Sequence, residues 1–247
     1  MINAGILIIG NEILSGRTLD KNSNFLCDRC SKIGISVAEI RIIPDEKIII
    51  KKVVLDLSKK YNYVFVTGGI GPTHDDITAD AIASAFNKKL ILNKKAENLL
   101  IEHYNKSKLE LNKSRLKMAF IPKFSTLILN PVSAAPGFKV NNVWVMAGVP
   151  KIMQAMFISS IEPKLKKGKK ITSKSINVLK PEGEIAIILE KINKKYVSVN
   201  IGSYPYYLPP NIGTNIVFRG IKISLVNSAI REFCNTLKNK GITFSID

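Results

Sequence analysis

Short apolar runs and amphipathic stretches alternate along the first third of the chain. The apolar runs at 4–10, 35–43 and 61–67 have the length of buried strands. Apolar positions recur at helical spacing in the stretches 22–33, 44–60 and 77–86. This repetition of strand and helix predicts a mostly parallel sheet, in the α/β class, with helices on both faces.

Local signals predict where two of these helices begin and end. Asn22 or Ser23 is a suitable N-terminal cap for the first helix, and Gly34 a suitable stop. Pro44 and the two acids after it favour the start of the second helix, because a helix N-terminus attracts negative charge.

The pattern changes beyond residue 90. A polar helical stretch at 94–119 precedes two apolar runs, at 125–130 and 142–148, which predict strands joined by a loop at 131–141. Pro150 then opens a short helix. We therefore expect a first domain at 1–163.

The remainder of the chain predicts a second, smaller domain. The segment KLKKGKK at 164–170 is charged and lacks apolar periodicity, as is typical of a linker. After it, the pattern predicts strand, helix, strand, strand, helix and strand, an order typical of a small α+β domain at 171–247.

Hydropathy favours a protein without membrane spans. Of the 247 residues, 46% are hydrophobic, which allows a sizeable core. The longest apolar runs are much shorter than the roughly 18 residues that a membrane-spanning helix needs. The N-terminus enters a strand directly, without the pattern of a signal peptide, so we expect a cytoplasmic protein.

The net charge of +18 raises the question of a polyanionic partner. The lysines are spread along the chain, and no sequence signature of a nucleic-acid-binding domain accompanies them. We expect them to attract small anionic substrates rather than to form a nucleic-acid-binding surface.

The stretch VTGGIGPTHDDITAD at 66–80 carries the clearest candidate chemistry. Gly68, Gly69 and Gly71 follow a strand and could expose backbone N–H groups to a phosphate, with Thr73 and Thr78 beside them. Asp75 and Asp76 would repel a phosphate unless a cation lies between them or they accept hydrogen bonds from the ligand. The loop therefore predicts either a divalent metal site or carboxylate recognition of an amino-heterocycle or ribose.

Other polar residues follow the remaining strand ends. Glu12, Ser15 and Arg17 lie in the loop after the first strand, and Asp45 follows the second. If the strand order is 2-1-3, these loops face one another across a crevice at the carboxyl ends of the strands. The loops at 133–138 and 146–150, the latter with Gly148, are expected to reach the same crevice.

Five ordered motifs resemble a known family: GNEILSGRTLDKN, IPDE, TGGIGPTHDDITADAIA, NPVSAAPGF and AGVP. Together they resemble the molybdopterin-binding (MoaB/Mog) domain, in the form found in the competence- and damage-inducible CinA proteins, over roughly residues 4–160. The N-terminal half of eukaryotic FAD synthase is similar. The second domain resembles the small module that follows this domain in CinA proteins. One departure is Ala147-Gly148, where the family usually has Pro-Gly.

The resemblance implies a three-layer α/β/α sandwich with a pocket for a pterin or a nucleotide phosphate. It implies that Asp45 and Asp76 are the functional pair, and that Gly68, Gly69, Gly71 and Thr78 line the pocket. It also implies that this domain is an enzyme in CinA-type relatives, cutting ADP-ribose or FAD with the help of a metal. Because such relatives self-associate, we expect a homo-oligomer.

Three functions remain open at the level of sequence. The first is a hydrolase of nucleotide diphosphates that uses Mg²⁺, Co²⁺ or Ni²⁺. In it Arg17, Ser15, Gly148, Thr73 and the glycine N–H groups bind phosphate, Asp75 and Asp76 hold the metal, and Asp45 or Glu12 acts as base. The second is a protein that binds or adenylylates molybdopterin. The third is a non-catalytic basic binding module.

Overall fold

The computed structural model describes residues 2–208 and 211–246. The chain divides into two units, residues 1–168 and residues 169–247.

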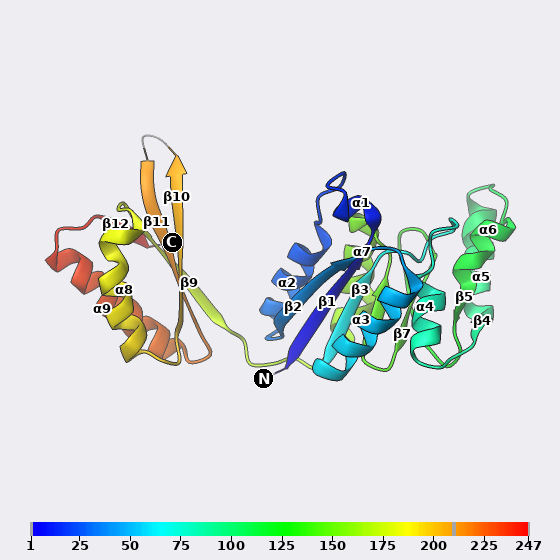
Figure 1. The fold of residues 1–247 in the computed structure, drawn as a ribbon, viewed down its shortest axis with the longest axis horizontal. Helices are drawn as coiled ribbons and strands as arrows, with labels where there is room; N and C mark the ends of the chain where they lie inside the picture. The colour runs from blue at the N-terminus through cyan, green and yellow to red at the C-terminus, as the bar shows by residue number, and fades with distance from the viewer. Residues whose placement is uncertain (1, 209–210, 247) are drawn as a thin grey trace. The chain divides into compact units, whose positions relative to one another are not determined.

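The first unit is built on a six-stranded sheet (Figure 1). Its order is β2 (Ser36–Ile43), β1 (Asn3–Ile9), β3 (Tyr63–Thr67), β8 (Val143–Met146), β7 (Gly137–Val140) and β6 (Thr126–Ile128). The first four strands are mutually parallel, whereas β7 and β6 run antiparallel to their neighbours. The predicted order 2-1-3 is confirmed.

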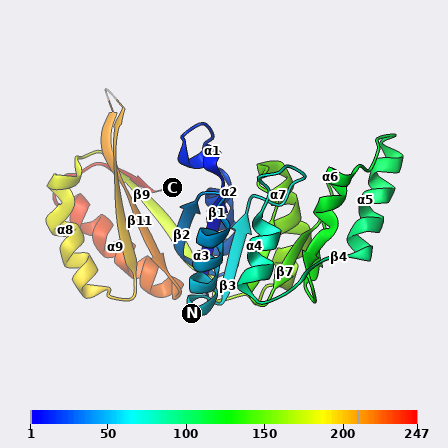
Figure 2. The ribbon, with the colours of Figure 1, turned by 45° about the vertical axis from the view of Figure 1, so that its right-hand side comes forward.

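Helices cover both faces of this sheet and make three layers (Figures 1 and 2). On one face, α3 (Lys47–Lys60) and α4 (Thr78–Ala85) pack on Leu7 and Ile9 of β1. On the other, α2 (Asn22–Lys32) and α7 (Pro150–Met156) pack on Ile6 and Ile8. Successive residues of β1 are buried on opposite sides, because a central parallel strand has no solvated face. The expected α/β/α sandwich is confirmed.

The loop expected at 131–141 contains a strand that the sequence pattern did not predict. Strand β7 pairs with both β6 and β8, and buries Phe138 and Val140. A Cβ on Gly137 would overlap the carbonyl oxygen of Val145, so the close pairing with β8 requires glycine there. The sequence pattern did not predict this strand because Pro136 and Gly137 are typical of a loop. The strand is also only four residues long.

The stretch expected as one helical region, 94–119, is interrupted. It forms α5 (Lys94–Lys106), α6 (Lys113–Leu116) and the 3₁₀ turn η1 (Lys117–Ala119). Two short strands, β4 (Leu90–Leu92) and β5 (Phe120–Pro122), flank this region and pair with each other. The pairing brings η1 to the loop after β3, where the Lys117 Nζ donates to the Thr73 carbonyl.

The start of α2 differs from the sequence prediction. The carboxylate of Asp20 accepts hydrogen bonds from the backbone N–H groups of Asn22, at 2.8 Å, and Ser23, at 3.2 Å. Neither Asn22 nor Ser23 caps the helix, and the Asn22 side chain is directed elsewhere. Gly34 follows the helix with a φ of 76°, as its expected role requires.

The expected linker at 164–170 belongs largely to the first unit. The short turns η2 (Phe157–Ile161) and η3 (Glu162–Lys164) continue from α7, and Leu165 is buried in the core behind them. Gly168 N–H donates to the Ile33 carbonyl at 3.0 Å, so the chain stays attached to the first unit up to this residue. Composition alone did not show this, because the anchoring residues lie between lysines.

The second unit is a four-stranded antiparallel sheet in the order β10 (Asn200–Leu208), β11 (Asn211–Gly220), β9 (Thr172–Val178) and β12 (Phe244–Ile246). Helices α8 (Glu182–Lys195) and α9 (Ile223–Asn239) pack on one face, around Ile176, Ile216 and Phe233. The element order and the α+β class agree with the sequence prediction.

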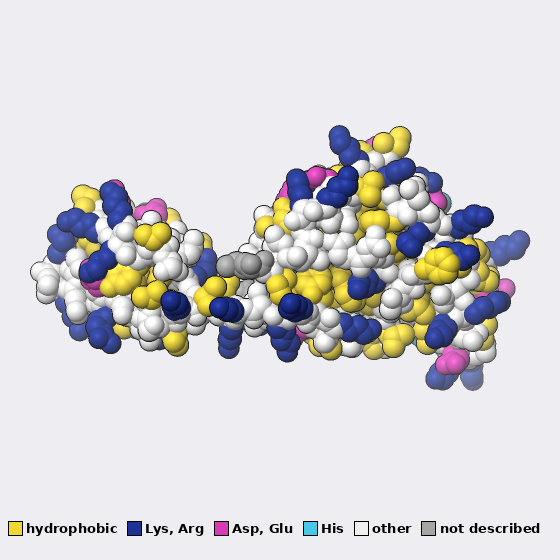
Figure 3. Space-filling model, turned by 90° about the horizontal axis from the view of Figure 1, so that it is seen from below, with side chains coloured by type: hydrophobic (Ala, Val, Ile, Leu, Met, Phe, Trp, Pro, Cys, Tyr) yellow, Lys and Arg dark blue, Asp and Glu magenta, His cyan; other side chains and the backbone are white. Residues whose placement is uncertain are grey.

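Lys and Arg side chains are scattered over the faces of both units that Figure 3 shows, rather than gathered in one place. None of the described helices combines the length and the apolar content that crossing a membrane requires.

Candidate functional site

The loops that leave β1, β3 and β8 at their carboxyl ends line one cleft of about 510 Å³ in the first unit. It lies where the order of the strands reverses, because β1 has β2 on one side and β3 on the other. Eight residues predicted for the site line this cleft: Glu12, Asp45, Gly68, Gly69, Gly71, Asp75, Asp76 and Gly148. The loops at 133–138 and 146–150 also reach it, as expected, through Ser133 and Ala147.

Two glycines allow the strand ends to converge. Gly68 has a φ of 106°, and a Cβ at this position would overlap the carbonyl oxygen of Ile9 at the end of β1. A Cβ on Gly148 would lie 3.2 Å from the Cα of Gly68. The floor of the cleft is therefore bare backbone, which a ligand can approach closely.

A buried asparagine, expected from sequence only as a helix cap, links the ends of β3 and β8. The Asn22 Nδ2 donates to the Gly148 carbonyl at 2.7 Å and to the Thr67 hydroxyl at 3.3 Å. Asn22 is only 6% exposed. Asn22 is therefore a positioning residue. The sequence did not indicate this role, because an Asn at the start of a helix is usually a cap.

The carboxylate of Asp45 lies half-buried between the loops. Its Oδ2 accepts a hydrogen bond from the Asn11 N–H at 3.0 Å. Burial raises the pKa of Asp45, and the charges of Glu12, Asp75 and Asp76 raise it further, against the lowering effect of the Asn11 hydrogen bond. Mutual repulsion among acids in one cleft favours a cation or a proton there.

The raised pKa of Asp45 predicts a pH-dependent cost in stability. Below the usual pKa of 3.8, Asp45 is protonated in both the folded and the unfolded chain. As the pH rises through the raised pKa, the folded chain must ionise a disfavoured carboxylate, so the free energy of unfolding falls and then levels off. Asp45→Asn keeps the acceptor for Asn11, and we expect it to be more stable than the wild type at pH 7, by about 1 kcal/mol or less.

Urea denaturation at pH 7 and at pH 4 checks this prediction, and the difference between variant and wild type should shrink at pH 4. A variant that is less stable than the wild type by the same amount at both values would contradict it.

Thr73 positions Asp76 instead of lining the cleft. Its N–H donates to the Asp76 Oδ2 at 2.8 Å, and its hydroxyl donates to the same oxygen. A hydrogen bond from the Thr73 side chain is also the largest cause that lowers the pKa of exposed Asp75. Because a hydroxyl donates only one hydrogen bond, Thr73 serves one of the two carboxylates at a time.

Three more predicted residues lie outside the lining of the cleft. Thr78 is fully buried beneath Gly69, and its N–H donates to the Gly69 carbonyl at 2.9 Å. The Ser15 hydroxyl donates to the Glu12 carbonyl at 3.2 Å, and Arg17 is exposed. Thr78 therefore supports the glycine turn, and neither Ser15 nor Arg17 is among the residues that line the cleft.

Glu12 belongs to a short helix rather than to a loop. Helix α1 (Asn11–Leu14) begins directly after Gly10, which the sequence pattern did not predict. A Cβ on Gly10 would lie 2.6 Å from each oxygen of the Glu12 carboxylate, so this carboxylate folds back over Gly10 into the cleft.

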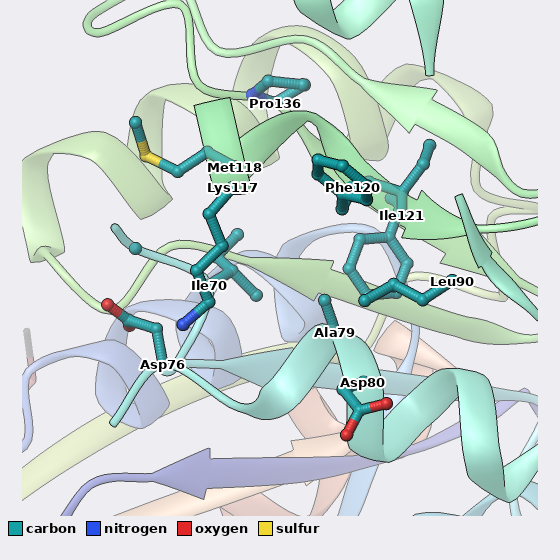
Figure 4. Close-up of a pocket in the computed structure, with 12 residues that line it drawn as sticks. Ile70, Asp76, Ala79, Asp80, Leu90, Lys117, Met118, Phe120, Ile121 and Pro136 are labelled. Atoms are coloured by element: carbon teal, nitrogen blue, oxygen red, sulfur yellow. The ribbon is translucent and has the colours of Figure 1, made fainter. Parts of the chain in front are cut away.

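A smaller pocket of about 40 Å³ adjoins the cleft and shares Gly71 and Asp76 with it (Figure 4). Leu90 and Phe120, from β4 and β5, form part of its apolar wall. Lys117 of η1 lies at its rim and donates to the Thr73 carbonyl at 2.5 Å.

The carboxylates that line the cleft suit a metal ion that is held partly by the protein and partly by a bound ligand. Among the residues that the structure describes, no three His, Cys, Asp or Glu side chains lie close enough to hold a metal ion together. Mg²⁺ is usually held by one or two carboxylates together with substrate phosphates, and Asp75 and Asp76 supply that number.

Comparison with known families covers nearly the whole chain. Residues 5–167 match the model described as a probable molybdopterin binding domain, and residues 170–245 match the FAD synthase middle domain. A protein of Archaeoglobus fulgidus is 36% identical over 239 residues, covering 95% of this chain and 98% of that protein. A protein of Pyrococcus abyssi is 31% identical, covering 98% of each.

Two further relatives carry the name CinA. A CinA-like protein of Desulforapulum autotrophicum is 33% identical over 80% of this chain, which spans 50% of its length. The crystal structure of the protein CinA from Thermoplasma acidophilum is 33% identical, with a TM-score of 0.58, over 64% of this chain and 94% of that one. The chain therefore belongs to the molybdopterin-binding-domain family, as a CinA-like member, and its second unit matches the FAD synthase middle domain.

Proposed function

We propose that the cleft binds a phosphorylated nucleotide and, with a divalent cation, hydrolyses its diphosphate linkage, as in ADP-ribose or FAD. The observation that carries this proposal is that four carboxylates, Glu12, Asp45, Asp75 and Asp76, line one glycine-floored cleft. Carboxylates beside a phosphate site need a cation to offset their repulsion.

The size and position of the cleft suit such a ligand. Its volume of about 510 Å³ lies within the range of about 300–1,000 Å³ for small-molecule sites. The glycine turn after β3 presents backbone without side chains, which suits the close approach of a phosphate. The match of the second unit to the FAD synthase middle domain favours a flavin or adenine nucleotide.

Each carboxylate has a proposed task. Asp75 and Asp76 hold the divalent cation, which when bound polarises phosphoryl oxygens and offsets the charge of the diphosphate. Thr73 keeps the Asp76 carboxylate in one orientation. Asp45 takes the proton of the attacking water, because a raised pKa brings a carboxylate nearer to the working pH of a general base. Glu12 lies close enough to raise the pKa of Asp45, and is the alternative base.

A second candidate function is the binding or adenylylation of molybdopterin. The description of the matching family as a probable molybdopterin binding domain favours it. In that function Asp45 and Asp76 accept hydrogen bonds from the amino groups of the pterin instead of flanking a cation.

The first function predicts metal-dependent release of AMP. The purified full chain is incubated with ADP-ribose or FAD and Mg²⁺, Co²⁺ or Ni²⁺, with EDTA as control, and AMP is measured by chromatography. We expect AMP only with a metal. No AMP with any of the three metals, together with molybdopterin that co-purifies from cells, would favour the second function.

A further inference from the structure

The described lining of the cleft holds no cationic side chain. Four carboxylates line it, and none of its described lining residues is Lys or Arg. A diphosphate carries negative charge itself, so one divalent cation leaves much of the repulsion in place. Arg17, the residue that sequence indicated for the phosphate, is exposed and outside this lining.

Lys117 binds the loop that carries Asp75 and Asp76. Its Nζ donates to the carbonyl of Thr73, the residue that also holds the Asp76 carboxylate. Figure 4 shows the Lys117 side chain extending toward Asp76 at the rim of the small pocket. Asp76 lines both the pocket and the cleft, and the Lys117 ammonium group is bound to the loop that carries Asp76.

Lys117 forms no ion pair with a carboxylate among the described residues. None of the ion pairs between described residues includes it, whereas nearby Lys47 pairs with Asp80 at 2.6 Å. The hydrogen bond to the Thr73 carbonyl orients the ammonium group and leaves its net charge for an incoming anion. The same charge contributes to the lowered pKa of Asp75.

The segment that carries Lys117 is held firmly. Asn112 caps α6 by accepting the N–H of Arg115 at 3.0 Å, and the Arg115 guanidinium stacks 4.6 Å from the centre of the Tyr104 ring. Ala119, two residues beyond Lys117, is buried against α5. Half-buried and anchored, Lys117 loses less freedom on binding a ligand than a free surface lysine would.

We propose that Lys117 binds a phosphate of the ligand in the cleft and thereby selects phosphorylated ligands over neutral ones. This proposal takes the class of ligand from the proposed function, but it does not depend on hydrolysis. Lys117 lies in the segment between β4 and β5. In this proposal Lys117 contacts the phosphate and Arg17 does not.

Calorimetric titration of ADP-ribose and of adenosine into the full chain tests the proposal, with Ca²⁺ in place of the Mg²⁺, Co²⁺ or Ni²⁺ of the hydrolysis assay so that binding is measured apart from turnover. Lys117→Gln removes the charge and keeps a donor for the Thr73 carbonyl, whereas Lys117→Met removes both. We expect either variant to bind ADP-ribose about 10- to 100-fold more weakly than the wild type, the scale of a hydrogen bond to a charged group. Adenosine binding should stay unchanged, and Arg17→Gln should weaken ADP-ribose binding less than about 3-fold.

Three results would overturn the proposal. Lys117→Gln that binds ADP-ribose like the wild type would reduce Lys117 to a support for the Thr73 loop, above all if Lys117→Met alone binds weakly. An equal loss for adenosine would mean that the change deforms the cleft. A wild type that does not bind ADP-ribose would overturn the ligand class as well, whereas binding without release of AMP would overturn only the hydrolysis.

Discussion

Asp76→Asn is expected to lower the rate of AMP release from ADP-ribose by about 100-fold or more, the scale of losing a charged group at a reacting centre. Asparagine keeps an oxygen that accepts the Thr73 N–H, so the loop should retain its shape. The substitution removes the negative charge that, in our proposal, holds the divalent cation. The rate is measured by chromatography at saturating Mg²⁺ and again across a range of metal concentrations.

Asp28→Asn is the matched control. Asp28 is an exposed residue of α2 that pairs with Lys32, outside the lining of the cleft, and its loss should leave the rate unchanged. Unchanged AMP release by Asp76→Asn, in a protein whose wild type is active, would remove Asp76 from the site.

Gly68→Ala is expected to lower the free energy of unfolding by about 3 kcal/mol and to abolish binding of ADP-ribose. Its φ of 106° lies where side chains other than glycine are strained, and the new Cβ would overlap the Ile9 carbonyl oxygen. Relief of that overlap would separate the ends of β1 and β3, which form the floor of the cleft. Urea denaturation and calorimetric titration give the two readouts.

Gly16→Ala is the control that measures the cost of backbone strain without a steric overlap. Gly16 has a φ of 72°, but a Cβ there meets nothing within 4 Å, so only the backbone cost of about 1–2 kcal/mol applies. Equal losses of stability in the two variants would show that the convergence of β1 and β3 is not what requires glycine at residue 68.

The sequence predicted the location of the cleft because general rules of parallel sheets govern it. Alternating apolar runs and helical stretches indicated β1, α3 and β3, and the reversal of strand order then placed the glycine loop opposite Asp45. The sequence also indicated Gly68, because a glycine directly after a strand is a strong local signal of a turn.

Contacts between distant segments were not predictable in the same way. Asn22 looked like a helix cap, yet its amide binds Gly148, which lies 126 residues further along the chain. Lys117 is one of many lysines, and only the pairing of β4 with β5 brings it to the Thr73 loop. Arg17 was expected to bind phosphate because of its type and its place in the loop, but it is exposed and is not among the residues that line the cleft.

Amide hydrogen exchange, measured by mass spectrometry with and without ADP-ribose and Mg²⁺, tests the location of the binding site most directly. It reports where the ligand binds whether or not hydrolysis follows, and backbone N–H groups are themselves the proposed phosphate contacts. We predict slower exchange in peptides that cover 10–18, 66–78 and 146–150, and unchanged exchange in 171–207. Unchanged exchange in these three loops at a saturating concentration of ligand, or protection confined to other parts of the chain, would contradict the account.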